Sequence, residues 1–196
     1  MDQAKRTNEA AAGEVALIFT DVEGFTEMVD RLGDAEVYLL MRRYHGIVAE
    51  ALARHGGTEL ERQGDGSLLA FADAPAALRC AIEIQRELAV HSARFPERPL
   101  RVRMGLHVGT PLRDRGQYFG RVLIVGARIM ALATGGEILA STSVRERTAT
   151  SGEFHFGPNR EVALKGLRQH HGVARVSWRH PLLEPAFSIV TRAYAA

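Results

Sequence analysis

Apolar residues in the first part of the chain follow two different periods. The run Glu14–Thr20 is rich in β-branched and aromatic residues and ends at the polar Asp21, which predicts a buried strand that enters a turn. From Ala35 to Arg54 the apolar residues recur every three or four positions, the spacing of one face of a helix. We expect Asp34 to cap this helix and Gly56 to end it.

The rest of the chain alternates strand and helix patterns. A Gly-Asp-Gly turn centred on Asp65 separates two apolar runs, which is typical of a hairpin. A second amphipathic stretch, with Pro75 in its first turn, predicts another helix. The predicted strands are 58–63, 67–71, 100–109, 137–140, 154–156 and 173–178, and the predicted helices are 73–94, 121–133 and a short one after 141–143.

These elements follow the order β-α-β-β-α-β, and an α-β portion comes after them. The order predicts an α/β (α+β) fold with a ferredoxin-like, split βαβ core. With 196 residues, the chain has the size of one domain. We expect a flexible lead-in over residues 1–13, the domain over 14–179 and a tail of unassigned role over 180–196.

Composition narrows the class of protein. Hydrophobic residues make up 46% of the chain and charged residues 24%, which is typical of a globular domain. No apolar run approaches the roughly 20 residues that span a bilayer, so we expect no membrane segment. The formal net charge of +2, without a basic stripe, does not favour nucleic acid as a partner. Cys80 is the only cysteine, so we expect it to be buried and the protein to be cytoplasmic.

Two carboxylates are placed to reach one end of the sheet. Asp21 follows the first strand and leads into a glycine turn, whose free backbone N–H groups at a helix start would suit a phosphate. If the hairpin strand after Asp65 lies beside the first strand, both carboxylates emerge together. Mg²⁺ is usually held by one or two carboxylates and by substrate phosphates. Taken singly, however, Asp21 could cap a helix and Asp65 could occupy an ordinary turn.

Five segments together resemble the catalytic domain of the class III adenylate and guanylate cyclases. They are FTDVEGFTEMVDRLGD, HGGTELERQGDGSLLAF, RVRMGLHVGTP, GQYFGRVLIVGARIMALATGGEILAS and ALKGL, which occur in this order between residues 14 and 178. The resemblance implies the cyclase fold and a reaction that closes a nucleoside triphosphate into a 3′,5′-cyclic monophosphate. It also implies two divalent metal ions, Mg²⁺ or Mn²⁺, and a homodimer with shared active sites.

The resemblance assigns roles to residues at the end of the first strand and in the hairpin. Asp21 and Asp65 match the two metal aspartates, and Val22 matches the position whose backbone carbonyl also reaches a metal. The turn that cradles the phosphates falls on Gly24, Phe25 and Thr26.

Two basic residues match the family later in the chain. Arg128 falls on the arginine that stabilises charge in the transition state, and its planar fork suits phosphate oxygens. Lys165 falls near the lysine that binds the triphosphate, although a solvated lysine would also fit there. In the family, the metal aspartates and the residues at Arg128 and Ile124 come from different subunits, which implies two composite sites across a two-fold axis. His107 is mid-strand, and we expect it to be packed there.

Three positions depart from the adenylate cyclase pattern: Glu61 replaces a lysine, Gln117 an aspartate and Ile124 an asparagine. A glutamate accepts hydrogen bonds from guanine N1–H and the 2-amino group, and guanylate cyclases resemble this chain in having it. The Gln117 amide could donate to guanine O6, so a base other than adenine is expected. The apolar Ile124 cannot orient the ribose, which leaves a pyrimidine triphosphate open as the substrate.

The sequence therefore favours a metal-dependent nucleotidyl cyclase, a phosphorus–oxygen lyase. The first alternative is a catalytically silent cyclase-homology domain that binds a nucleotide or regulates a partner, and it is motivated by the three departures. The second is related phosphoryl-transfer chemistry on a polymerase-like palm, which the absent Gly-Gly-acidic-acidic-Phe signature disfavours.

Overall fold

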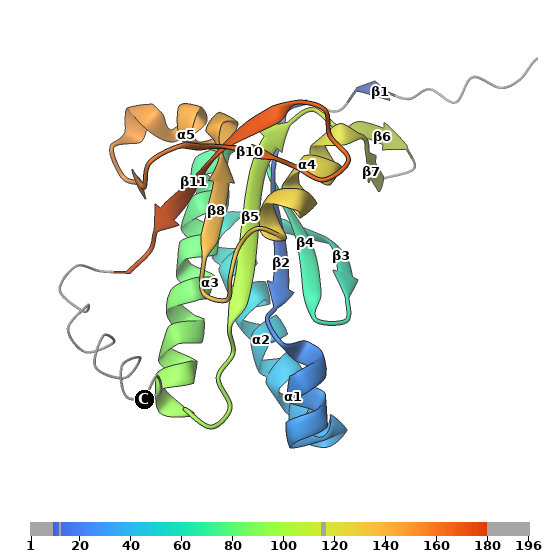
Figure 1. Ribbon diagram of the computed structural model, residues 1–196, viewed down its shortest axis with the longest axis vertical. Coiled ribbons are helices and arrows are strands. Elements are labelled where there is room, and N and C mark those ends of the chain that lie inside the picture. The colour runs from blue at the N-terminus through green and yellow to red at the C-terminus, as the bar shows by residue number, and fades with distance from the viewer. Residues whose placement is uncertain (1–9, 12, 115–116, 180–196) are drawn as a thin grey trace, which may run out of the picture.

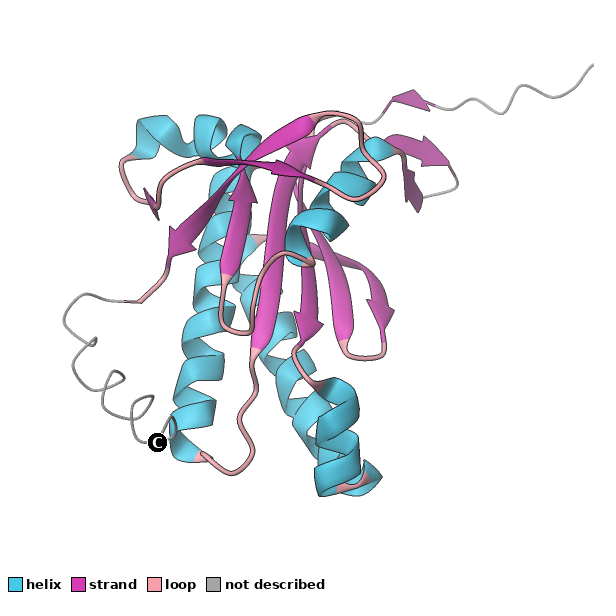
Figure 2. Ribbon diagram, viewed as in Figure 1, coloured by secondary structure: helices cyan, strands magenta, loops and turns pink. Residues whose placement is uncertain are grey.

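The protein is built around one large mixed sheet with helices on both faces (Figures 1 and 2). The computed structural model describes residues 10–11, 13–114 and 117–179. Most of the expected lead-in and the whole expected tail, 180–196, therefore lie outside the described residues. Within the lead-in, Ala10–Ala11 forms a short strand that pairs with the strand at 112–114.

The strands belong to two sheets. The eight-stranded sheet contains β2 (Val15–Val22), β3 (Thr58–Gln63), β4 (Gly66–Phe71), β5 (Val102–Gly109), β8 (Ile138–Ser141), β9 (His155–Phe156), β10 (Arg160–Ala163) and β11 (His170–Ser177). The small sheet contains β1 (Ala10–Ala11), β6 (Leu112–Asp114) and β7 (Gln117–Phe119).

Five α-helices and one 3₁₀ turn complete the described chain. They are α1 (Phe25–Leu32), α2 (Asp34–His55), α3 (Ala74–Arg94), α4 (Arg121–Met130), α5 (Thr142–Thr148) and the 3₁₀ turn Ala149–Ser151.

The strand order confirms the ferredoxin-like core. The large sheet runs β10-β11-β8-β5-β2-β4-β3, so the first core strand, β2, lies between β5 and β4 and is antiparallel to both. β3 pairs with β4 as the predicted hairpin, and β8 extends the sheet parallel to β5. The expected α-β portion is present as β8, α5 and the last strands.

The two faces of the central strands pack against different helices. Ile18 of β2 and Met104 of β5 are fully buried in the main core with α2 and α3. On the other face, Phe19 packs beside α4, since a Cβ added to Gly126 would lie 2.5 Å from the Phe19 ring. This alternation of faces along a strand is what fixes the direction of every site residue on β2 and β5.

The helix termini agree only partly with the sequence predictions. The helix predicted over 73–94 begins at Ala74, because Asp73 is its N-cap and accepts a hydrogen bond from the Ala76 N–H at 2.8 Å. The prediction for Asp34 was wrong: Gly33 is the N-cap of α2, and Asp34 is already helical. The cause is α1, a separate helix that the apolar pattern did not reveal and that ends at Gly33.

The ends of the other elements agree with the sequence pattern to different degrees. α2 ends at Gly56 as predicted, with φ at +68°. The helix predicted to reach residue 133 ends at Met130, and the short strands β6, β7 and β10 were missed because three or four residues carry little periodicity. Cys80 is buried as expected, and desolvation raises the pKa of its thiol to about 12. None of the described helices is both long and apolar enough to cross a bilayer.

Candidate active site

Asp21 lies near the end of β2, between the two neighbouring strands. Its backbone pairs with Gly66 of β4 on one side and with Arg103 of β5 on the other. Arg103 holds the carboxylate, with Nε at 2.7 Å and Nη2 at 2.6 Å from Asp21 Oδ2. Both side chains are partly exposed, at 23% for Asp21 and 35% for Arg103, so a ligand can still reach them.

Asp65 is brought to the same place by the turn of the β3–β4 hairpin. The Val22 N–H donates to the Asp65 carbonyl oxygen at 3.2 Å, which joins the turn to the end of β2. Desolvation is the largest cause that raises the pKa of the Asp65 carboxyl, and the charge of Asp21 raises it further, while Arg103 opposes the shift. Asp21 and Asp65 are two partly desolvated carboxylates that repel each other, and a bound cation would stabilise them.

Arg103 is a candidate site residue that the sequence analysis missed. The segment around it had been matched to the family, but no role was given to the arginine itself. Arg103 lies on β5 directly opposite Asp21 of β2. This position could have been found only by pairing β2 with β5 in the correct register. The sequence therefore contains little signal for Arg103, and its place beside Asp21 comes from the strand pairing.

A buried polar cluster fixes the strands beside the aspartates. The Thr20 hydroxyl lies 2.6 Å from the Tyr44 hydroxyl and accepts a hydrogen bond from the Ser67 N–H at 3.0 Å. Burial raises the pKa of Tyr44 to about 12, so the phenol stays neutral and keeps its proton for hydrogen bonding. This cluster ties α2, β2 and β4 together one residue before Asp21.

The turn after β2 opens directly into a helix. Gly24 is the N-cap of α1 and has φ at +69°, a conformation that favours glycine. Phe25 and Thr26 form the first turn of α1, where backbone N–H groups lack partners within the helix. The sequence predicted such a turn, and the structure places it directly after Asp21 and Val22.

Arg128 of α4 lies next to Lys165. Arg128 Nε donates to the Lys165 carbonyl oxygen at 3.2 Å. Lys165 stands on a tight turn between β10 and β11, and Leu164 beside it is buried against Val125 and other residues of α4. Both basic side chains belong to exposed residues, so their charges face outward.

The three residues that depart from the adenylate cyclase pattern are exposed. Ile124 projects from α4 with 49% of its surface accessible, which is high for an isoleucine. Gln117 begins β7 and pairs with Asp114. Glu61 lies on the edge strand β3, where its carboxylate accepts a hydrogen bond from the Gln63 amide.

The candidate residues therefore form two groups within one chain. The metal end consists of Asp21, Val22, Asp65, Arg103 and the turn Gly24–Thr26. The α4 side consists of Ile124, Arg128 and Lys165. Within the described residues, no hydrogen bond or ion pair joins the two groups.

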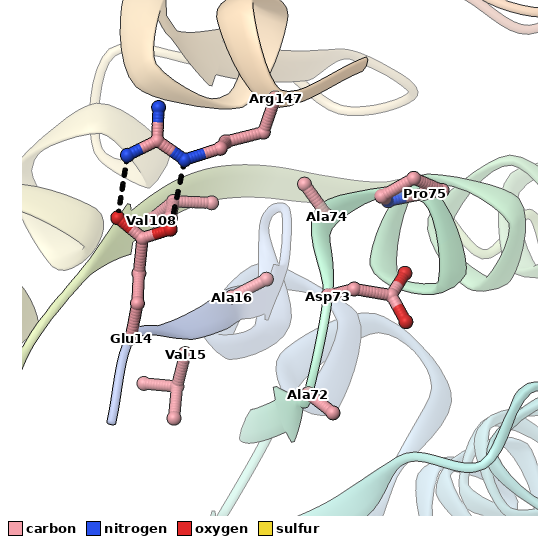
Figure 3. Close-up of a pocket in the computed structure, with 9 residues that line it drawn as sticks. All are labelled: Glu14, Val15, Ala16, Ala72, Asp73, Ala74, Pro75, Val108 and Arg147. Carbon is pink, nitrogen blue, oxygen red and sulfur yellow. Dashed lines mark hydrogen bonds and ion pairs between the residues drawn. The ribbon is translucent and has the colours of Figure 1, made fainter. Parts of the chain in front are cut away.

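A small hollow in the structure lies away from both groups. It has a volume of about 140 Å³ and is lined by the start of β2, the end of β5, the start of α3 and Arg147 (Figure 3). Arg147 forms a forked ion pair with Glu14, at 2.8 and 2.7 Å. The hollow lies at the opposite end of β2 from Asp21. It is also smaller than the roughly 300–1,000 Å³ that is usual for ligand pockets, so this hollow is not the triphosphate site.

Comparison with known proteins shows to which family the chain belongs. The sequence profile described as "Adenylate and Guanylate cyclase catalytic domain" matches residues 7–175. The chain belongs to this family. An adenylate cyclase of Mycosarcoma maydis is 30% identical to the cyclase domain over 156 residues, which cover 67% of this chain and 6% of that protein.

Solved cyclase structures share the fold over most of the domain. The adenylate/guanylate cyclase/hydrolase from Silicibacter pomeroyi is 26% identical, with a TM-score of 0.77 and coverage of 85% of this chain and 98% of that chain. The guanylyl cyclase Cya2 is also 26% identical, with a TM-score of 0.75 and coverage of 86% and 93%. Among the eight curated relatives compared, the cyclase domain spans between 6% and 57% of their lengths.

The donor set of the cyclase domain fits a hard divalent cation. The described residues contain no group of three or more His, Cys, Asp or Glu side chains arranged around a common point. What they offer is two carboxylates beside a turn that starts a helix at Gly24. That set suits Mg²⁺ or Mn²⁺, which complete their coordination with water and phosphate oxygens, better than zinc, which favours His and Cys.

Proposed function

We propose that this domain converts a nucleoside triphosphate into a 3′,5′-cyclic monophosphate and pyrophosphate. The observation that carries the proposal is the convergence of Asp21 and Asp65, which the pairing of β2 with β4 brings together beside the turn at Gly24. Hard oxygen ligands next to free helix N–H groups are suited to a metal–triphosphate complex.

Asp21, Asp65 and the Val22 carbonyl would hold two divalent ions, Mg²⁺ or Mn²⁺. When bound, such ions polarise a hydroxyl and neutralise a leaving pyrophosphate. The backbone of Gly24–Thr26 then binds phosphate oxygens. Arg103, which now neutralises Asp21, lies where its guanidinium can turn to the triphosphate.

In the reaction, the ribose 3′-oxygen forms a bond to the α-phosphorus and the bond to the β-phosphate oxygen breaks. The 3′-hydroxyl proton passes to solvent, since no side chain at the metal end is placed as a general base. Arg128 stabilises the additional negative charge on the α-phosphate in the transition state, and Lys165 binds the outer phosphates.

Two copies of the chain would complete each site. Ile124 and Arg128 are exposed on α4, and in the proposed assembly they would act at the metal end of a second copy. Leu112 and Phe119, directly opposite each other in the β6–β7 hairpin, are 45% and 47% exposed. An exposed apolar pair beside α4 is typical of a surface that is covered in an assembly. A two-fold dimer would form two such sites.

The base pocket would select against adenine. Glu61 presents acceptor oxygens on the edge strand β3, where one of them accepts a hydrogen bond from the Gln63 amide. Guanine offers N1–H and a 2-amino group as donors, whereas adenine offers an acceptor at N1. We therefore propose GTP as the leading substrate, with a pyrimidine triphosphate as the other candidate because Ile124 removes the ribose hydrogen bond.

The test is incubation of the purified protein with ATP, GTP, CTP and UTP, each with Mg²⁺ or Mn²⁺, followed by mass spectrometry for cyclic products. We expect a cyclic product, lost when EDTA is added and lost in the Asp21→Asn, Asp65→Asn double variant. A product that persists in the double variant would show that another enzyme made it. If ATP proves the best substrate, the base assignment is wrong.

A silent nucleotide-binding domain is the second candidate, and the exposed, apolar Ile124 is the observation that favours it. Misplacement of the 3′-oxygen by about 1 Å can cost on the order of a hundredfold in rate. Calorimetry with Mn²⁺ and a nucleoside triphosphate separates the candidates. Tight binding without any cyclic product would identify a silent domain.

A further inference from the structure

Glu23 is a third acidic residue at the metal end, but its side chain is engaged elsewhere. It stands between Val22 and Gly24 and is half-buried. Its backbone N–H donates to the Arg101 carbonyl oxygen at 2.8 Å, and its Oε1 accepts a hydrogen bond from the Gly135 N–H at 2.7 Å. The residue is therefore held through both its backbone and its side chain.

Gly135 leaves no room for a side chain beside the Glu23 carboxylate. A Cβ added to Gly135 would lie 2.4 Å from Glu23 Oε2 and 2.7 Å from Arg101 Cβ, distances that real Cβ atoms do not show. Only a glycine at position 135 lets the backbone come this close, so the fit depends on the identity of both residues.

The segment that carries Gly135 is itself fixed to the sheet. The Gly136 N–H donates to the Val102 carbonyl oxygen at 2.9 Å. The Glu137 N–H donates to the Thr134 carbonyl oxygen at 2.9 Å, and the Glu137 side chain accepts from the Thr134 N–H at 2.8 Å. Glu23 is thus bonded to a closed turn between α4 and β8, which offers a rigid point of attachment.

We infer that Glu23 is a positioning residue: its bond to Gly135 fixes the turn at Val22–Thr26 in the geometry that receives the metal–triphosphate complex. This inference rests on the proposed function. The residues on either side of Glu23 are Val22, whose carbonyl is a proposed metal ligand, and Gly24, whose positive φ sets the directions of the first N–H groups of α1. A carboxylate acceptor makes a stronger hydrogen bond to a backbone N–H than a neutral group does.

The same bond excludes Glu23 from the proposed metal ligands. A carboxylate that ligated a metal would have to release the Gly135 N–H, which would then lie partly buried without a partner. The inference also links two parts of one chain, because the turn at Gly135 follows α4, the helix that carries Arg128. In a dimer with shared sites, Glu23 would therefore hold the metal end of one site against the helix that serves the other.

Four single variants test the role. Glu23→Ala removes the acceptor, Glu23→Gln keeps an acceptor oxygen without the charge, and Gly135→Ala displaces the carboxylate from the other side. Glu50→Ala is the matched control, because it removes an exposed carboxylate from the outer side of α2 and changes the net charge equally. Melting temperatures show whether each variant folds.

Two readouts do not depend on turnover. Hydrogen exchange of the Gly135 amide should be faster in Glu23→Ala than in the wild-type protein and the control, and slow again in Glu23→Gln. The Kd for Mn²⁺ with GTP should rise about tenfold in Glu23→Ala and in Gly135→Ala, on the basis that a displacement below 1 Å costs less than a hundredfold. Where the protein is active, kcat should fall with KM raised, and Glu23→Gln should restore most of both.

The inference is overturned if Glu23→Ala matches Glu50→Ala in Gly135 exchange and in Mn²⁺–GTP binding. It is also overturned if Glu23→Gln is as impaired as Glu23→Ala while Gly135 exchange stays slow, since a metal ligand would behave in that way. A wild-type protein that binds Mn²⁺–GTP but forms no cyclic product would contradict the proposed cyclase activity and leave the exchange and binding tests of Glu23 valid.

Discussion

The metal end and the α4 side differ in how completely one chain builds them. At the metal end, Asp21, Asp65 and Arg103 are partly buried, Asp21 is ion-paired with Arg103, and strand pairing and the Thr20–Tyr44 cluster fix the strands that carry them. On the α4 side, Ile124 and Arg128 are exposed, and Arg128 donates a hydrogen bond to the Lys165 backbone carbonyl.

This difference is what a shared active site requires. Residues that hold metals must be preorganised before the substrate arrives, because like charges repel until a cation is bound. Residues that act on a second copy must instead point outward from their own chain. The prediction that follows is an asymmetry: substitutions at the metal end should damage the site in the same chain, whereas substitutions on α4 should damage the site of the partner.

The largest effect is expected at the metal end. Asp21→Ala or Asp65→Ala should lower turnover by at least about a hundredfold, since the loss of one preorganised electrostatic group often costs that much. Turnover is measured in saturating Mn²⁺, with the exposed Asp30→Ala as the control on α1. Full activity of either variant would remove that aspartate from the metal site.

Asp65 should also show opposite effects on stability and on activity. Its raised pKa means that the folded state favours the protonated carboxyl, so its contribution to stability is present at acid pH and is lost as pH rises. At neutral pH, without metal, Asp65→Asn should therefore melt at a slightly higher temperature than the wild-type protein. A lower melting temperature would contradict the cause given for the shift.

The next effect is a recovery of activity across the dimer. Asp21→Ala and Arg128→Ala should each be inactive, and an equal mixture should regain about a quarter of wild-type activity, because half of the dimers are mixed and one of their two sites is intact. Mixed dimers are verified by native mass spectrometry. If they form without any activity, both groups act within one chain.

A smaller change is expected at the base pocket. Glu61→Lys with Gln117→Asp and Ile124→Asn should shift the ratio of kcat/KM for ATP over GTP toward ATP by at least about tenfold, the range of a mismatched hydrogen bond. Ile124→Asn alone should raise kcat without changing the preferred base. An unchanged ratio in the triple variant would place base selection elsewhere.

A further effect, on stability and not on activity, concerns the buried side of α4. His107 lies beneath the start of this helix and bonds to Ser141, and burial together with His171 lowers its pKa to about 4. As the pH falls, His107 is protonated in the unfolded chain before it is protonated in the folded chain. The contribution of the neutral, buried His107 to stability is therefore present above pH 6.5 and is lost as the pH falls.

Between pH 7 and pH 5 the wild-type protein should lose about 2 kcal/mol of unfolding free energy through His107, at about 1.4 kcal/mol per pKa unit. His107→Gln should show a smaller loss in urea denaturation, and the exposed His155→Gln should behave like the wild-type protein. Equal losses in all three proteins would show that His107 is not the buried neutral group.

Sequence patterns determined most of the fold and the metal end. The long periodic elements were predicted within a few residues, and the Gly-Asp-Gly hairpin placed Asp65 correctly because hairpin signals are local. The prediction for Asp34 was wrong because the short helix α1 precedes it, and the helix after residue 120 ends three residues before its predicted end. Element boundaries depend on a few local contacts, which periodicity does not contain.

The residues themselves determined the family, the candidate aspartates and the candidate base-pocket positions that depart from the adenylate cyclase pattern, because these are properties of residue types in a fixed order. Only the tertiary structure decided that Arg103 neutralises Asp21 and that Glu23 is bonded to Gly135 rather than free to bind a metal. These contacts join residues 82 and 112 positions apart. Their partners are set by strand register and by how closely two backbones approach, and neither quantity can be read from the spacing of residues along one chain.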